Sequence, residues 1–344
     1  MRLVQFHLPK KGHRVGFVDG NSLIDLTSAN PDWTCVREVF FTARRSGSTI
    51  DALIGGLSLG NADRVSYTRL LENRPGDDDG WLLPPLDHPD PAHCAISGTG
   101  LTHLGSMAAR AEMHTLANQP DDAKTDSQKM FEMGLSGGKP KAGQRGVQPE
   151  WFYKGNGTLL RSHNDFLDIP NFTEDGGEEP ELVGCYIIDD SGVPCRIGFA
   201  IGNEWADHRM ERVNYLWLAP SKMRVCAMGP ELVTDARFAD VRGHCRIVRD
   251  GAELYHSGEL LTGEAHMSHT LANLEDHHFK YPQFRIPGDV HLHFFGTMKL
   301  SFPNRPTFAT GDRIEIGFSG MGAPLVNVVR QIPRSQTPVR VEKG

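Results

Sequence analysis

The sequence has no long apolar run, few cysteines and no block of like charge. No segment approaches about 18 consecutive apolar residues, which argues against a membrane-spanning helix. The N-terminal segment lacks the apolar stretch of a secretory signal, so we expect a cytoplasmic protein. Six cysteines in 344 residues, none of them in a C-x-x-C pair, are too sparse for a disulfide scaffold and indicate reduced residues, most of them in the core.

The charge balance excludes another class of partner. Asp and Glu outnumber Lys and Arg by 43 to 36, which gives a formal net charge of −7. An acidic chain without a basic cluster is a poor ligand for nucleic acid or for an anionic membrane surface. We therefore expect no nucleic-acid partner and no membrane partner.

Glycine (37 residues) and proline (22 residues) are abundant and follow no short repeat. This composition favours many turns and a β-rich body over a helical bundle. From Trp151 onward, short apolar segments alternate with turn signals, which is typical of a sandwich or roll. We predict an α+β, β-rich fold.

Two regions are expected. Residues 1–88 form a small N-terminal α/β domain with a linker, because a hairpin signal at Asp19-Gly20-Asn21 and two helical stretches precede a segment rich in proline. Residues 89–335 form the larger domain. Within it, the polar and glycine-rich segment 100–148 is predicted to be an active-site lid with helices near Met107–Leu116 and Ser127–Met133.

The most informative motif is Glu179-Pro180-Glu181. Residues two apart on a strand point to one face, and two like charges there repel unless a cation neutralises them. Closing the following hairpin with Ile188 opposite Val193 places Glu179 near Gly202. Glu204 then lies about one side-chain step further along. We therefore predict that Glu179, Glu181 and Glu204 converge at the open end of one hairpin.

Three carboxylates suit a hard cation such as Mg²⁺, with Mn²⁺ or Ca²⁺ as alternatives. A solvated acidic strand end is the simpler interpretation, and the spacing alone leaves both open. A histidine site at His291-x-His293 is a weaker alternative, because no Glu follows at the distance that a cupin-like site needs. The pairs at 266–269 and 277–278 also lack the Glu of a zinc protease motif. No dinucleotide fingerprint, P-loop or nucleophile elbow is present.

The stretch from Trp151 to about Val329 resembles the catalytic domain of the fumarylacetoacetate hydrolase superfamily. The segments that carry the resemblance occur in the family's order: Phe152-Tyr153-Lys154, Glu179-Pro180-Glu181, Gly198 to Trp205, Lys222, Gly229 to Thr234, Gly288-Asp289 and Gly296-Thr297. The family usually has Asp where this chain has Glu204. The resemblance implies a mixed β-sandwich roll for the larger domain, and it strengthens the metal interpretation of the three glutamates.

The resemblance also implies roles for individual residues. Lys222 would stabilise carboxylate or enolate charge, or would act as a base if its pKa were lowered. Lys154 would bind substrate or form a structural ion pair, and Gly296 and Thr297 would contact substrate. His103 would be the proton shuttle. The family's water-activating His–Glu pair is incomplete, because Ser106 stands three residues after His103, and Glu112 is the candidate replacement.

The sugar-acid branch of the superfamily is the closest in appearance. It implies a Mg²⁺-dependent dehydration of a 2-keto-3-deoxy sugar acid of the pentonate type, through a metal-stabilised enolate. Hydrolysis of a C–C bond in an acylpyruvate or 2,4-diketo acid is the first alternative. A non-catalytic protein that binds sugar acids is the second. The partner is a small 2-oxo acid, and the resemblance further implies a homodimer.

Overall fold

The computed structural model describes residues 1–105, 124–173, 175–335 and 337–344. The helix expected at Met107–Leu116 and the candidate Glu112 lie outside these residues. The helix expected at Ser127–Met133 is confirmed as α6 (Asp126–Gly137). No helix in the described ranges has the length and apolar content that crossing a bilayer requires.

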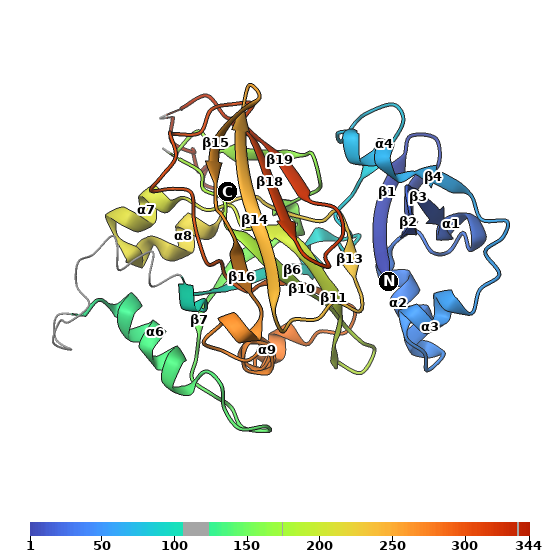
Figure 1. Ribbon diagram of the computed structural model, residues 1–344, viewed down its shortest axis with the longest axis horizontal. Helices are drawn as coiled ribbons and strands as arrows, with labels where there is room; N and C mark the ends of the chain where they lie inside the picture. Colours follow the sequence, from blue (N-terminus) through green and yellow to red (C-terminus); the bar gives the residue numbers. More distant parts are fainter. Residues whose placement is uncertain (106–123, 174, 336) are drawn as a thin grey trace.

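The segment predicted as the N-terminal domain forms one end of the molecule (Figure 1). Its strands are β1 (Arg2–Leu8), β2 (Gly12–Asp19), β3 (Ser22–Asp25), β4 (Arg64–Ser66) and β5 (Trp81–Leu82). Its helices are α1 (Leu26–Ala29), α2 (Val36–Arg45), α3 (Ile50–Gly55) and α4 (Tyr67–Glu72). The hairpin predicted around Gly20 is confirmed, because β2 and β3 pair antiparallel with Asp19 opposite Ser22.

The remaining strands are β6 (Cys94–Gly100), β7 (Glu150–Asn156), β8 (Leu160–Arg161), β9 (Phe166–Ile169), β10 (Pro180–Ile188), β11 (Pro194–Asn203), β12 (Cys226–Met228), β13 (Leu232–Val233), β14 (Val241–Arg249), β15 (Ala252–His256), β16 (Leu260–Thr262), β17 (Val290–Phe294), β18 (Arg313–Phe318) and β19 (Leu325–Gln331). The further α-helices are α7 (His208–Val213), α8 (Leu218–Lys222) and α9 (Leu271–Phe279). Short 3-10 turns cover Pro91–His93, Gly157–Leu159, Tyr215–Trp217, Glu264–His266 and Pro282–Phe284.

These strands form two sheets in the described chain. The larger has the order β4-β3-β2-β1-β13-β11-β10-β17-β6-β7, so β1 joins the N-terminal strands to the rest through β13. The smaller has the order β15-β14-β18-β19-β9. Helices α6, α7 and α8 lie at the end of the molecule opposite the N-terminal strands (Figure 1). The predicted β-rich α+β class is confirmed.

Strand β10 lies at the centre of the molecule and is buried along its whole length. Val183 and Ile187 pack into the core beneath the N-terminal helices, while Leu182 packs into the core between the two sheets. A strand covered on both faces reads as a continuous apolar run. Helix α2 covers the first core with an apolar stripe at helical spacing, namely Val36, Val39, Phe40 and Ala43. This packing fixes β10, and with it the glutamates at its start.

All six cysteines are free, and five of them are buried, as the sequence predicts.

Candidate active site

The three predicted glutamates meet at one place. One carboxylate oxygen from each of Glu179, Glu181 and Glu204 lies within 4.8 Å of the other two, and all three residues are buried. In the part of the chain that the structure describes, this is the one group of His, Cys, Asp or Glu side chains close enough to share a metal ion. The predicted convergence is confirmed.

The predicted register of the hairpin is wrong by two residues at the site. Ile188 pairs with Pro194 rather than Val193, because the Asp189 carboxylate accepts hydrogen bonds from the amides of Ser191 and Val193 and holds a longer turn. A β-bulge at Cys185/Tyr186 then shifts the pairing by one more residue, so that it differs from the predicted pairing by two.

The observed register brings the three glutamates closer together than the predicted register does. Glu181 lies opposite Gly202. The Glu204 amide donates to the Glu179 carbonyl at 3.0 Å, so these two ligands face each other across the strands.

Glu179 is held as a carboxylate by the Lys222 ammonium and the His208 imidazole. The Lys222 amine donates to it, and His208 Nε2 lies 3.0 Å from the same oxygen. Burial by itself raises the pKa of Glu179, but Lys222 and His208 more than offset that effect and hold it below its usual range. Burial by itself lowers the pKa of Lys222, but the charges of Glu179, Glu204 and Glu211 more than offset that effect and raise it. Lys222 therefore carries a proton and does not suit the role of a base.

Glu204 bridges two buried lysines. The amine of Lys154 donates to one oxygen, and that of Lys222 donates to the other at 2.6 Å. Lys154 also donates to the carbonyls of Trp205 (2.6 Å) and Lys222 (2.7 Å), so its three protons all have protein acceptors. Lys154 is fully buried and does not line the cavity. Lys154 thus forms a structural ion pair, the second of the two roles expected for it. In this arrangement it has no proton left to donate to a substrate.

Glu181 has no cationic partner among the described residues. Its carboxylate accepts one hydrogen bond, from the Gly296 amide at 2.6 Å. Burial, together with the charges of Glu179 and Glu204, raises its pKa well above the usual range. A buried carboxylate without a cation is costly, and a divalent ion beside three such oxygens would remove that cost. The donor set therefore fits a hard, oxygen-binding metal ion.

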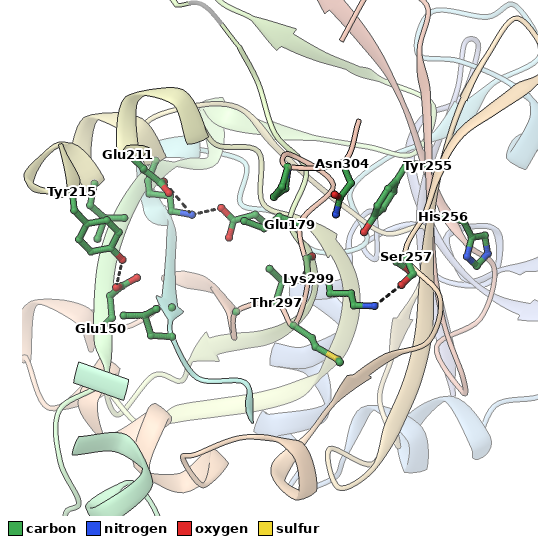
Figure 2. A pocket seen from close by; sticks show the side chains of 18 residues that line it. Glu150, Glu179, Glu211, Tyr215, Tyr255, His256, Ser257, Thr297, Lys299 and Asn304 are labelled. Carbon is green, nitrogen blue, oxygen red and sulfur yellow. Dashed lines mark hydrogen bonds and ion pairs between the residues drawn. The ribbon is translucent and has the colours of Figure 1, made fainter. Parts of the chain in front are cut away.

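A cavity of about 660 Å³ opens beside these glutamates, within the usual range for a small-molecule site. Figure 2 shows Glu150, Glu211 and Tyr215 on one side, and Tyr255, Ser257, Lys299 and Asn304 on the other. The full lining is Gly100, Leu101, Glu150, Glu179, Glu211, Tyr215, Leu218, Lys222, Tyr255, His256, Ser257, Gly296, Thr297, Met298, Lys299, Leu300, Pro303 and Asn304. The predicted residues Lys222, Gly296 and Thr297 all border this space.

Gly296 occupies a position that a larger residue would strain. Its φ is +90°, and a Cβ there would lie 2.6 Å from the Thr102 hydroxyl oxygen. His103 lies directly behind it, with its Nε2 2.9 Å from the Thr262 hydroxyl. The imidazole is buried and does not border the cavity. Burial lowers the pKa of His103 to about 3, so the ring is neutral near pH 7.

Glu178, which lies just before strand β10, forms hydrogen bonds to the segment that follows Gly296. The Glu178 carboxylate accepts from the Ser301 amide at 2.7 Å and from the Ser301 hydroxyl at 2.6 Å. Arg305 donates to the Ser301 hydroxyl at 2.9 Å and to the Gly176 carbonyl at 2.7 Å. Because Glu178 precedes the ligand Glu179, this network sets the position of residues 297–304 relative to the metal site.

Replacing Glu178 by Gln should therefore loosen the cavity wall without removing a metal ligand. We expect KM for the substrate to rise about tenfold, since hydrogen bonds to a buried charge are worth about 1.5–3 kcal/mol, while Mn²⁺ affinity stays close to wild type. Calorimetric titration with Mn²⁺ and steady-state kinetics measure the two effects. S301A, which keeps the amide donor, should show a smaller rise. Equal losses of metal and substrate affinity would contradict a positioning role.

Sequence reasoning missed several residues of the site. His208 follows Glu204 by four positions, and its ring reaches Glu179 because Asp207 caps α7 by accepting from the Met210 amide at 3.1 Å. Glu211, on the same helix, lies 3.8 Å from the Lys222 amine. The acidic doublet that contains Glu178 was a usable signal. The sequence carried no signal that Tyr255, Lys299 and Asn304 border the cavity.

The histidines that offered an alternative metal site instead pack together in the core. His278 Nε2 lies 3.0 Å from His291 Nδ1, and the Ser97 hydroxyl lies 2.8 Å from His293 Nδ1. All three rings are buried. Among the described residues they do not form a group that could share a metal ion, which agrees with the structural interpretation.

Comparison with known proteins gives matches by structure. No protein-family model and no curated protein matches the sequence. A 2-keto-3-deoxyarabinonate dehydratase matches with a TM-score of 0.69 and 19% identity, over 97% of this chain and 100% of its own. A 2-keto-3-deoxy-D-arabinonate dehydratase complexed with magnesium and 2,5-dioxopentanoate matches with a TM-score of 0.67, the same identity and the same coverage.

A fumarylacetoacetate hydrolase from the psychrophilic Exiguobacterium antarcticum matches with a TM-score of 0.60 and 18% identity, over 96% of this chain and 100% of its own. A 5-carboxymethyl-2-hydroxymuconate delta-isomerase from Mycobacterium smegmatis matches with a TM-score of 0.55 and 17% identity, over 96% and 100% of the two chains. The chain thus shares its fold with these proteins, which include a fumarylacetoacetate hydrolase, as the resemblance implied. By name, these neighbours are a dehydratase, a hydrolase and an isomerase.

Proposed function

We propose that this protein is a lyase that removes water from a 2-keto-3-deoxy sugar acid, with Mg²⁺ held by Glu179, Glu181 and Glu204. The observation that carries the proposal is the buried triad of carboxylates, of which Glu181 lacks any cationic partner among the described residues. The dehydratase neighbour complexed with magnesium and 2,5-dioxopentanoate supports the same class of chemistry. When bound, such an ion supplies positive charge that stabilises negative charge on the 2-oxo oxygen.

The chain's own residues supply the remaining parts. Lys222, held as an ammonium, borders the cavity and suits the donation of a hydrogen bond to a substrate oxygen. Glu211 also borders the cavity, and its carboxylate is positioned by the Ser221 hydroxyl at 2.8 Å. We assign Glu211 as the base that takes the C3 proton. The C4–O bond then breaks, and the leaving hydroxide takes the proton that Glu211 removed from C3. The substrate loses one H₂O in total, and Glu211 returns to its carboxylate form.

Thr297 and His103, for which the family resemblance implied roles, keep supporting roles in the proposed reaction. Thr297 lies at the cavity wall, where its hydroxyl donates to the Lys299 carbonyl at 3.1 Å and can also accept a bond from substrate. His103 remains the proposed proton shuttle, although Gly296 and Thr102 lie between it and the cavity. A H103N variant with unchanged turnover would remove it from the mechanism.

Product analysis by NMR tests the proposal. The purified protein with Mg²⁺ is given 2-keto-3-deoxy acids and acylpyruvates, with E211Q as the comparison variant. We expect an intact carbon skeleton that has lost water, and E211Q should lower kcat by about 100-fold or more, in the range of general-base catalysis. Pyruvate plus a second carboxylic acid would instead establish C–C hydrolysis. Tight binding of the acids without any turnover would favour the non-catalytic alternative.

A further inference from the structure

The cavity has two chemically different ends. One end is bordered by Glu179 of the triad, with Lys222, Glu211 and Glu150. The other end is bordered by Tyr255, Ser257, Lys299 and Asn304 (Figure 2). Every charge at the first end has a partner or a proposed ligand. The second end holds a single ammonium and no carboxylate among the described lining residues. A ligand that spans the cavity therefore meets a cation at its distal end.

Among the described residues that line the cavity, Lys299 is a cation without a carboxylate partner. Its amine donates one hydrogen bond, to the Ser257 carbonyl at 3.0 Å, and forms no ion pair with a carboxylate in the described chain. An ammonium has three protons to donate, so two remain for a ligand. Lys154 and Lys222, in contrast, are buried and paired with glutamates. Lys299 is thus the cavity lysine without a counterion in the part of the chain that the structure describes.

Two further polar groups border the same end of the cavity as this ammonium. Neither the Tyr255 hydroxyl nor the Asn304 side-chain amide bonds to another described residue. Burial, with the charge of Glu178, raises the pKa of Tyr255, so its hydroxyl keeps a proton to donate. Figure 2 shows both groups on the same side of the cavity as the Lys299 amine. Three donor groups thus border one side of the cavity, and each has at least one proton without an acceptor among the described residues.

Two of these donors, Lys299 and Asn304, belong to a segment that hydrogen bonds within the protein hold in place without a ligand. The Thr297 hydroxyl donates to the Lys299 carbonyl at 3.1 Å, and the Asn304 amide donates to the Ser301 carbonyl at 2.8 Å. Ser301 is in turn fixed by Glu178. Donors fixed in advance bind an anion with a smaller loss of conformational entropy. The arrangement has the properties of a built subsite.

We infer that Lys299, Tyr255 and Asn304 bind the distal carboxylate of a 2-oxo dicarboxylic acid. The inference rests on the proposed function, since it requires the 2-oxo acid end of the ligand to lie at Glu179, Glu181 and Glu204. A neutral hydroxyl tail would leave the ammonium without a counterion, and a phosphate would bring a second negative charge against a single cation. The substrate class therefore narrows from sugar acids in general to 2-keto-3-deoxy sugar diacids.

Calorimetric titration of the Mg²⁺-loaded protein tests this subsite without any turnover. The probes are 2-oxopentanoate, 5-hydroxy-2-oxopentanoate and 2-oxopentanedioate, with the six-carbon diacid 2-oxohexanedioate as a longer probe. We expect at least one diacid to bind about tenfold more tightly than both monoacids, which is typical of one charge-assisted hydrogen bond. K299M should abolish this preference and leave 2-oxopentanoate affinity unchanged, and K299R should restore part of it.

A matched control comes from Lys141, which is exposed and does not border the cavity. K141M should keep the full preference for the diacid. Equal affinities for all probes, tighter binding of the hydroxyl-tailed acid, or a preference that survives in K299M would each overturn the inference and leave the proposed function standing. Failure of every probe to bind would overturn both. E181Q separates the two ends, because it should weaken monoacids and diacids alike.

Discussion

Glu181→Gln should abolish metal binding and turnover without destabilising the metal-free protein. Glu181 is the triad member with no cationic partner in the described chain, and its burial beside Glu179 and Glu204 raises its pKa. Its negative charge is therefore unfavourable until a cation arrives, and an isosteric amide removes that cost. We expect Mn²⁺ affinity to fall by at least ~100-fold, since changes in the shell outside the ligands already cost 10–100-fold. The melting temperature in EDTA should stay constant or rise.

Glu204→Gln is the matched contrast. Glu204 neutralises both Lys154 and Lys222, and Lys154 is fully buried. Removing one partner of a buried ion pair costs about 3–5 kcal/mol, which lowers the melting temperature of a domain of this size by roughly 10 °C. Both variants should lose metal affinity, but E204Q alone should lose stability. A similar loss of stability in E181Q would contradict the charge assignment at the site.

Acidification should unfold the protein well above the pH at which its surface carboxylates titrate. His278, His291 and His293 are buried in mutual contact. Burial lowers the pKa of His291 to about 4 and, with help from His291, that of His293 to about 3. Burial and the two neighbouring rings lower the pKa of His278 as well. In the unfolded chain these rings titrate near pH 6.5.

The sign of the effect follows from proton uptake. Between the unfolded pKa near 6.5 and the lower folded pKa, the unfolded chain binds more protons, so stability falls as the pH falls. Each ring contributes up to ~1.4 kcal/mol per pH unit, so the three together remove up to ~4 kcal/mol per pH unit below about pH 6. Against a total stability of about 5–15 kcal/mol, we expect a midpoint of acid unfolding near pH 5.

Urea unfolding between pH 7 and pH 5 measures this slope. H291F should lower the slope of unfolding free energy against pH by the contribution of about one proton. This change is independent of the effect of H291F on stability at pH 7. His93 provides a control of opposite sign, because its hydrogen bond to Asp289 raises its pKa. Its contribution is present below the unfolded pKa and is lost as the pH rises, so H93N should make the acid-induced loss slightly steeper. An unchanged slope in H291F would show that the buried rings do not govern acid stability.

Much of the fold follows from local sequence patterns. The apolar stripe of α2 and the turn signal at Gly20 depend on neighbours within a few residues, so they predict these elements directly. The Glu179-Pro180-Glu181 spacing likewise predicts two carboxylates on one face of a strand. The apolar run of β10 reflects burial on both faces, and the sequence shows it because each face meets a different core.

The hairpin register is different, since it depends on a side-chain-capped turn and a bulge rather than on the alternation of residues. The local pattern therefore predicted that the three glutamates converge, but it misplaced their pairing by two positions.

Only the tertiary structure decided how the charges are distributed. The sequence pattern does not predict that Lys154 is buried with Glu204, or that Lys299 borders the cavity without a counterion among the described residues. The role of Lys222 likewise changed from a possible base to a fixed ammonium, because three glutamates from different segments surround it. The sequence determined which ionisable groups exist. Long-range packing determined which of them are neutralised, and the free energy of burying a charge depends on that pairing.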